Sequence, residues 1–470
     1  MRKSFAAAAV VALALLAAGC GSKSGSASGA ESGATIAPAS SLAFVSVNTD
    51  ESSDPWKSAD ALLKKFPIRD KLLAQINAGL SDQGVDFNRD IRPLLGPELD
   101  FAVLSAGSSS PQLVGMTQPT DKSKFEAEIA KGANPSVHVE IGDWVVFSDR
   151  ETALDQFKTE AQKAKLADDS AFKDATGELP GGAANATAFV NGGQLLGVLE
   201  QSVPQLGALP TGQLQWVALA LSSQSDAAKL EGVFKSAQSA GQSFTPKLLT
   251  KVPSNALALL SFHGSAQLTQ QLTQNPTLAQ ATGQIQQFLG VGLTDITRLI
   301  AGEGALYVAP GVPFPEVTLV LEEANPAAAM ATLNEVAARV AVALHGKLTA
   351  VGPVKKLDLG TIAIYYGVSG HTLMISDSSG HIVGPVGTPI TDDPVFSKAK
   401  DAAGLPDQSA GFLYVNIKNS IPVIEGLGQA SGNALPPDVS QNLAPLESFL
   451  AYVVPGDSGV TKFSAQLHIR

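Results

Sequence analysis

The fold follows from the stretch PASSLAFVSVN at residues 38–48, which recurs as PSNALALLSFH at residues 253–263. Each copy predicts a strand, at Leu42–Asn48 and Leu257–Phe262. Three further stretches recur in the same order and at similar offsets. They pair Gly84–Glu98 with Gly290–Glu303, Gly142–Asp149 with Gly370–Asp377, and Ala188–Asn191 with Leu413–Asn416. Matches that keep their order indicate an internal duplication.

Both copies share a coarse plan in which helices follow the opening strand and pairs of strands come next. The predicted helices are 55–65, 68–80 and 122–131 in the first copy, and 266–289 and 326–344 in the second. The predicted strands include 99–105, 112–117, 136–141 and 144–148, and then 305–309 and 316–322. Short strands mixed with amphipathic helices predict an α+β fold rather than a doubly wound sheet. We expect two related modules, residues 38–246 and 247–470, each an antiparallel sheet with packed helices.

The N-terminus has the layout of a cleavable signal peptide. Arg2 and Lys3 precede an uninterrupted apolar run from Phe5 to Leu16, which is too short to span a bilayer comfortably. The run ends in LLAAGC at residues 15–20, which resembles the bacterial lipobox, although Ala17 stands where Leu is more usual. The resemblance implies that residues 1–19 are removed and that the Cys20 thiol carries a diacylglycerol. Acyl chains on this residue would hold the protein to a membrane.

Residues 20–37 read as the lipidated cysteine followed by a Gly/Ser/Ala tether, which behaves as a flexible chain. Cys20 is the only cysteine, so disulfides within the chain, CxxC redox chemistry and cysteine-based zinc sites are excluded. The formal charge is −11, and the low charged fraction of 16% leaves enough apolar residues for a sizeable core. An acidic chain without a basic stripe is a poor partner for nucleic acid.

Three segments resemble a bacterial family known as domain of unknown function 3352, which is common in actinobacteria and their relatives. They are the opening at residues 38–48, the helix end LLKKFP at residues 62–67, and DIRPLLG at residues 90–96. Members often carry a Trp where this sequence has Leu94. The resemblance implies an envelope-anchored protein and supplies no catalytic residues.

No catalytic motif has its required companions. Ser170–Lys173 and Ser397–Lys400 both spell SxxK, but neither has an SxN loop or a KTG-like strand, and the two do not align between the copies. A GxSxG elbow, a phosphate loop ending in GK[ST] and an HExxH helix are all missing from the sequence. Chance therefore explains the SxxK matches.

Polar residues near element ends are expected to form caps and turns. Asp392-Asp393, Ser148-Asp149 and Ser376-Asp377 fit capping positions, and Glu322-Glu323 ends a strand ahead of Asn325-Pro326. Asn191 and Asn416 fit turns at strand ends. The six histidines are scattered, and His138 and His468 are predicted to face solvent from strands. His371 and His381 flank a hairpin, where a shared metal is the less favoured alternative.

These features predict a non-enzymatic lipoprotein on the outer side of the cytoplasmic membrane, with a binding or scaffolding role. The expected partners are the membrane itself, through Cys20, and an envelope protein or an apolar ligand. The first alternative is a carrier or sensor of a lipid or small apolar molecule, which the positive mean hydropathy of +0.14 also fits. The second alternative is an envelope hydrolase with an unfamiliar site. No catalytic residue, cofactor or metal ligand is predicted.

Overall fold

The computed structural model describes most of the chain from Gly33 onward. The described residues are 33–71, 74, 86–104, 111–131, 136–195, 214–237, 241–264, 283, 297, 299–383 and 387–470. The predicted leader and Cys20 lie outside them, as do most of the predicted helices at 68–80 and 266–289. Among the described residues, no helix is both long and apolar enough to cross a membrane.

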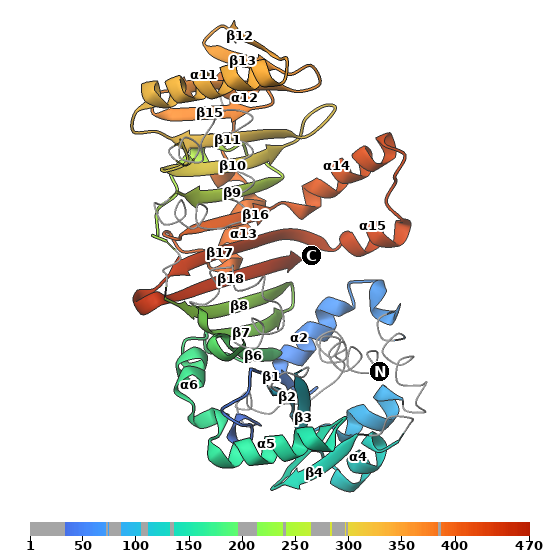
Figure 1. Ribbon diagram of the computed structural model, residues 1–470. Helices are drawn as coiled ribbons and strands as arrows, with labels where there is room; N and C mark the ends of the chain where they lie inside the picture. The colour runs from blue at the N-terminus through green and yellow to red at the C-terminus, as the bar shows by residue number, and fades with distance from the viewer. Residues whose placement is uncertain are drawn as a thin grey trace.

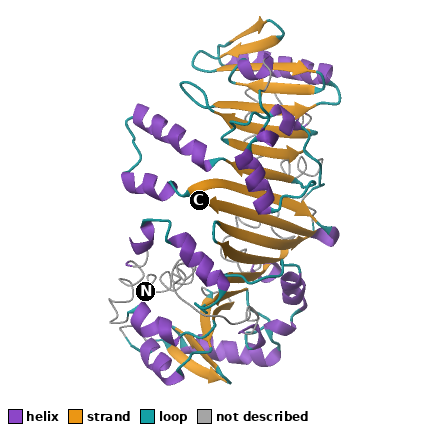
Figure 2. Ribbon diagram, turned by 180° about the vertical axis from the view of Figure 1, so that it is seen from behind, coloured by secondary structure: helices purple, strands orange, loops and turns teal. Residues whose placement is uncertain are grey.

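One antiparallel sheet dominates the molecule, and its 18 described strands stack into a long ladder (Figures 1 and 2). Strands lie about 4.8 Å apart in a sheet, so the ladder is on the order of 80 Å long. In spatial order its strands are β4 (Val137–Ile141), β5 (Trp144–Ser148), β3 (Gln112–Thr117), β2 (Glu98–Leu104), β1 (Ala43–Asn48), β6 (Ala186–Asn191), β7 (Leu214–Gln224), β8 (Ala227–Ser236), β18 (Val460–Ile469), β17 (Leu446–Pro455), β16 (Gly411–Val415), β9 (Ala258–His263), β10 (Glu303–Ala309), β11 (Glu316–Glu322), β15 (Thr372–Ser376), β14 (Ala363–Ser369), β13 (Val354–Asp358) and β12 (Lys347–Val351).

The prediction of two modules, each with its own sheet, is wrong. β8 pairs with β18 in an unbroken register from Val460 opposite Lys235 to His468 opposite Ala227. This pairing joins the two halves into one sheet. It is favourable because β8 and β18 would otherwise both be edge strands. Without it, β8 and β18 would each present a row of unpaired backbone groups.

The strand order is nevertheless the same on both sides of this central pair. Reading inward, β5-β3-β2-β1-β6-β7-β8 on one side corresponds to β15-β11-β10-β9-β16-β17-β18 on the other. The opening strands β1 and β9, which carry the recurring sequence, each lie between the same two neighbours. The predicted module boundaries stay a prediction.

Two sides of the sheet can be distinguished by the opening strands. We call face A the side that carries Phe44 and Leu259, and face B the side that carries Val45 and Leu260. On face A, α5 (Glu151–Lys163), α6 (Ser170–Gly177) and α13 (Pro394–Ala403) cover two large apolar clusters. On face B, α11 (Pro326–Ala343) packs against β13, β14 and β15. In the described ranges, the other helices of eight or more residues are α2 (Asp54–Leu63), α4 (Lys122–Ile129) and α14 (Ile417–Ala430).

Several predicted helix starts and turns are confirmed. Asp393 accepts hydrogen bonds from the Val395 and Phe396 amides at the start of α13. Asn325, which follows the Glu322-Glu323 pair, caps α11 ahead of Pro326. Asn191 and Asn416 accept hydrogen bonds from the amides of Gln194 and Asn419 at their strand ends.

Of the predicted caps, Ser376 accepts a local hydrogen bond from the Ser378 amide at 3.1 Å, whereas Ser148 and Asp377 bond to distant strands instead. The Ser148 hydroxyl donates to the Leu113 carbonyl oxygen on the neighbouring β3 at 2.8 Å. Asp377 accepts a hydrogen bond from the Val317 amide at 2.9 Å. These side chains therefore tie together strands that are far apart in sequence, which local spacing does not reveal.

Candidate functional site

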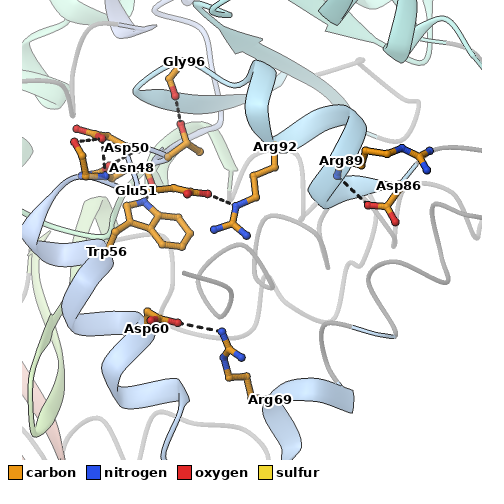
Figure 3. A network of polar contacts seen from close by, with 12 residues as sticks. Asn48, Asp50, Glu51, Trp56, Asp60, Arg69, Asp86, Arg89, Arg92 and Gly96 are labelled. Carbon is orange, nitrogen blue, oxygen red and sulfur yellow. Dashed lines mark hydrogen bonds and ion pairs between the residues drawn. The ribbon is translucent and has the colours of Figure 1, made fainter. Parts of the chain in front are cut away.

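A network of polar side chains surrounds the end of β1 (Figure 3). The Trp56 indole nitrogen on α2 donates to the carbonyl oxygen of Asn48, the last residue of β1. The hydroxyl of Thr49, the next residue, donates to the Gly96 carbonyl oxygen at 2.6 Å. The guanidinium of Arg92 is paired with the Glu51 carboxylate. These contacts hold the loop after β1 against the segment that leads into β2.

Asp60 on α2 is the second centre of this network. Its carboxylate is paired with Arg69 at 3.1 Å and with Lys64 at 2.5 Å, and its side chain is only 9% exposed. The two cations compensate the charge of this nearly buried carboxylate, and Asp60 therefore links α2 to the Arg69 guanidinium that follows it in the chain.

Two uncompensated carboxylates lie beside the network, on face A of β2. Glu98 is 3% exposed and Asp100 is 0% exposed, and Ser46 on β1 is equally buried at 3%. The register places Ser46 opposite Asp100 and Asn48 opposite Glu98. Side chains two residues apart on a strand share a face, so the two carboxylates are neighbours.

Burial raises the pKa of both groups, because a low-dielectric surrounding disfavours the charged form. The pKa of Glu98 rises to about 8, with the charge of Asp100 as the second cause. The pKa of Asp100 rises to about 7, although Ser46 and the Gly33 amide beside it act in the opposite direction. No well-formed hydrogen bond from the described residues reaches either carboxyl oxygen of Asp100. At neutral pH the pair therefore holds at least one proton inside the protein.

The first described turn of the chain rests on this pair. Gly33 begins a short 3-10 turn, Gly33–Thr35, and a Cβ atom added at Gly33 would lie 1.8 Å from Asp100 Oδ2. Only glycine allows so close an approach. Ala34 and Ala37, which follow in the chain, are 0% exposed and belong to the apolar cluster of face A. The acid pair is closed off from solvent, so it can store a proton but cannot reach a substrate.

In the second half of the sheet, a corresponding turn at residues 247–251 is bound by a single buried carboxylate. Glu303 lies opposite His263 as Glu98 lies opposite Asn48, and it is also 3% exposed. Its Oε1 accepts hydrogen bonds from the amides of Lys247 and Leu248, both at 2.7 Å. Ala305 occupies the position that corresponds to Asp100. The buried pair is therefore specific to the first half.

The comparisons with known proteins give a family and no activity. Residues 4–133 and 124–468 match the model of a family described as "Protein of unknown function (DUF3352)". The chain belongs to the DUF3352 family. The predicted resemblance is confirmed at this level, and no curated protein matches the chain.

Solved structures similar to this DUF3352 chain include two crystal forms of TP0453. Form IV is 14% identical, with a TM-score of 0.25, and the match covers 44% of this chain and 74% of that one. Form III is 8% identical, with a TM-score of 0.23, and the match covers 43% and 78%. Neither likeness is close enough to support an argument about fold or function.

The sequence motifs do not assemble into a catalytic site in this DUF3352 chain. Ser170 begins α6 and Ser397 lies within α13, on opposite sides of the central strand pair. Lys173 of the first motif is exposed and pairs with Asp168. His371 Nδ1 lies 3.3 Å from the Glu323 carbonyl oxygen, whereas His381 contacts Glu316 and Tyr307. Among the described residues, no three His, Cys, Asp or Glu side chains form a group that could hold a metal ion.

One histidine prediction is wrong. His138 on β4 is one-third exposed, but the His468 side chain on β18 is only 4% exposed, and its Nε2 lies 3.0 Å from Glu447 Oε2. α13 packs against β17 and β18 on face A, and its Lys398 pairs with the same Glu447 carboxylate, so this end of β18 is covered by a helix rather than solvated. The sequence alone does not show which strands and helices pack around β18, so it could not predict that His468 is buried.

A first prediction concerns the anchoring of the second-half turn. Glu303→Ala is expected to lower the free energy of unfolding by about 2 kcal/mol, because it leaves the buried Leu248 amide and the part-buried Lys247 amide without their acceptor. Glu303→Gln keeps a side-chain oxygen and is expected to lose less than half as much. Urea unfolding at pH 7 measures both. Equal losses would show that these hydrogen bonds do not anchor the turn.

Proposed function

We propose that this chain is a lipid-anchored lipoprotein of the bacterial envelope that acts as a binding or scaffolding protein on the outer side of the cytoplasmic membrane. The sequence supports the anchor, because the apolar leader ends at the only cysteine, Cys20. The buried turn Gly33–Thr35 starts the body, so the flexible part of the predicted tether is residues 21–32, which would reach about 20 Å on average. The body therefore lies close to the membrane surface.

The observation that supports a binding role is the single long sheet. It presents a ladder on the order of 80 Å long next to the membrane. The buried carboxylates are closed off from solvent, and the polar network of Figure 3 is internally compensated. Turnover by the purified protein on a panel of ester, amide and glycoside substrates would contradict the non-enzymatic role.

The anchor gives a second prediction. Cys20→Ser is expected to abolish incorporation of labelled fatty acid, because no other thiol can accept the lipid. Ser22→Ala is the matched control and is expected to label as the wild type does. Intact mass of the native protein should show a chain that begins at Cys20 and carries acyl groups. A bare thiol or an attached leader would refute the anchor.

One observation favours the second candidate function, an apolar-ligand carrier. Leu413, Leu260 and Leu306 lie side by side across β16, β9 and β10 on face B, and they are 39%, 40% and 36% exposed. A row of half-exposed leucines is suited to an apolar partner. Native mass spectrometry of protein from its own host would reveal co-purified lipid. Replacing Leu260 by Asn should then reduce the lipid retained.

A further inference from the structure

A groove of about 430 Å³ runs along the last described strand at one end of the sheet, between β4 and α5. Figure 1 shows both elements at the lower end of the ladder. The β4 wall includes Val137 and Val139, and the α5 wall includes Glu151, Leu154, Asp155 and Lys158. Val139 packs on the apolar cluster of face A, so the groove lies on that face.

The strand that borders this groove has a free edge. Among the described strands, β4 pairs only with β5, and the register closes at Ile141 opposite Trp144. The turn between them contains Gly142 at φ 60, as two-residue hairpins require. Hydrogen-bonded pairs alternate in an antiparallel ladder, so the backbone N–H and C=O groups of His138 and Glu140 point away from β5. Within the part of the chain that the structure describes, no backbone group pairs with them, so they can accept another strand.

The helix wall runs alongside this edge. Glu151, Leu154, Asp155 and Lys158 follow the spacing that places side chains on one face of a helix. Leu154 is 3% exposed and forms an apolar floor, whereas Glu151 and Asp155 are exposed on the rim. Lys158 is already paired with Asp155 at 3.5 Å. The groove thus combines a free strand edge, an apolar floor and a net negative rim.

We propose that β4 and α5 form a docking site for an extended polypeptide segment that adds to the sheet as one further strand. The partner segment carries alternating apolar residues over Leu154 and a basic residue against Glu151 and Asp155. Strand addition supplies backbone hydrogen bonds, and pockets for alternate side chains supply specificity. This inference deepens the proposed binding function and rests on it.

Charge argues against a second copy of this chain as the occupant. In a symmetric β4–β4 pairing, the acidic rims of both copies would lie on the same side of the joined sheet. Like charges brought together in this way are unfavourable. A partner with a basic residue meets the opposite charge instead.

The experiment selects random linear peptides displayed on phage against the full mature chain carrying Cys20→Ser, so the result does not depend on the lipid. Affinity of the enriched peptide is then measured by fluorescence anisotropy. Glu140→Pro removes an outward N–H, while leaving the hydrogen bonds to β5 in place. We expect it to weaken binding at least about tenfold, because backbone hydrogen bonds are lost. Ala350→Pro is the matched control, since Ala350 holds the same position beside the turn of the β12–β13 hairpin.

Charge reversal at an exposed position provides a second test that is not expected to disturb the fold. Asp155→Lys should weaken the basic peptide about tenfold, whereas Glu335→Lys on α11 should change nothing. Failure to enrich any peptide, or equal affinity for wild type and both groove variants, would overturn the docking site while leaving the lipid anchor untouched. A dimer seen by sedimentation velocity and abolished by Glu140→Pro would also overturn it, because the occupant would be a second copy.

Discussion

Asp100→Asn is expected to flatten the loss of stability that the wild-type protein shows between pH 5 and pH 8. The carboxyl groups of Glu98 and Asp100 have pKa values near 8 and 7 in the folded protein, against about 4 in an unfolded chain. Between these limits the folded state binds more protons than the unfolded state. Their contribution to stability is therefore fully present below about pH 4 and is lost as the pH rises through 7 and 8.

The expected size of this effect is on the order of 3 kcal/mol, because each unit of pKa shift corresponds to about 1.4 kcal/mol and the two groups share their protons. Urea unfolding at pH 5, 7 and 8 measures it. Asp100→Asn removes one titrating group, and its free energy of unfolding should exceed that of the wild type at pH 8. Glu335→Gln, at an exposed helix position, is the control and should keep the wild-type slope.

A flat profile in the wild type would contradict the buried pair. So would an Asp100→Asn profile as steep as the wild-type one. Asp100→Ala offers a further check, because Ala305 shows that the matching position in the second half accepts alanine. This variant should fold and should also lose most of the slope.

Local features of the fold were predictable because they depend on neighbouring residues. The strand at residues 43–48, the hairpin around Gly142 and the α13 start at Pro394 all lie where the pattern indicated. Proline at a first helical position, glycine in a tight turn and a preceding Asp act over a few residues. Such signals are present in the sequence itself.

Long-range pairing was not predictable in the same way. An apolar pattern shows that one strand face is buried, but not which strand lies beside it. β8 and β18 are separated by more than 200 residues, and their pairing decides that the sheet is continuous. The burial of His468 likewise depends on a distant element, because α13 packs against β17 and β18 on the face that carries this side chain.

The buried acid pair left a partial signal. Glu98 and Glu303 align between the two copies of the recurring sequence, and an acid kept at matching positions is consistent with the shared burial that the structure shows. Asp100 stands within the apolar run LDFAVL at residues 99–104, where a charged residue is unusual. An acidic residue within an apolar strand indicates a buried carboxylate. Its contact with Gly33 could not be predicted, because the two residues are far apart in the sequence.

The continuous sheet leads to the last prediction. Ala465→Pro is expected to lower the free energy of unfolding by about 3 kcal/mol or more, because Ala465 lies opposite Leu230 on β8 and Ala451 on β17. Proline in an interior strand removes a ladder hydrogen bond that no water can replace. Amide hydrogen exchange should also accelerate on β8, more than 200 residues away in sequence. Glu140→Pro, at the free edge of β4, should cost less than about 1 kcal/mol and leave β8 protected. If the β8 amides in Ala465→Pro exchanged as slowly as in the wild type, the prediction would fail. The two halves of the sheet would then unfold independently of each other.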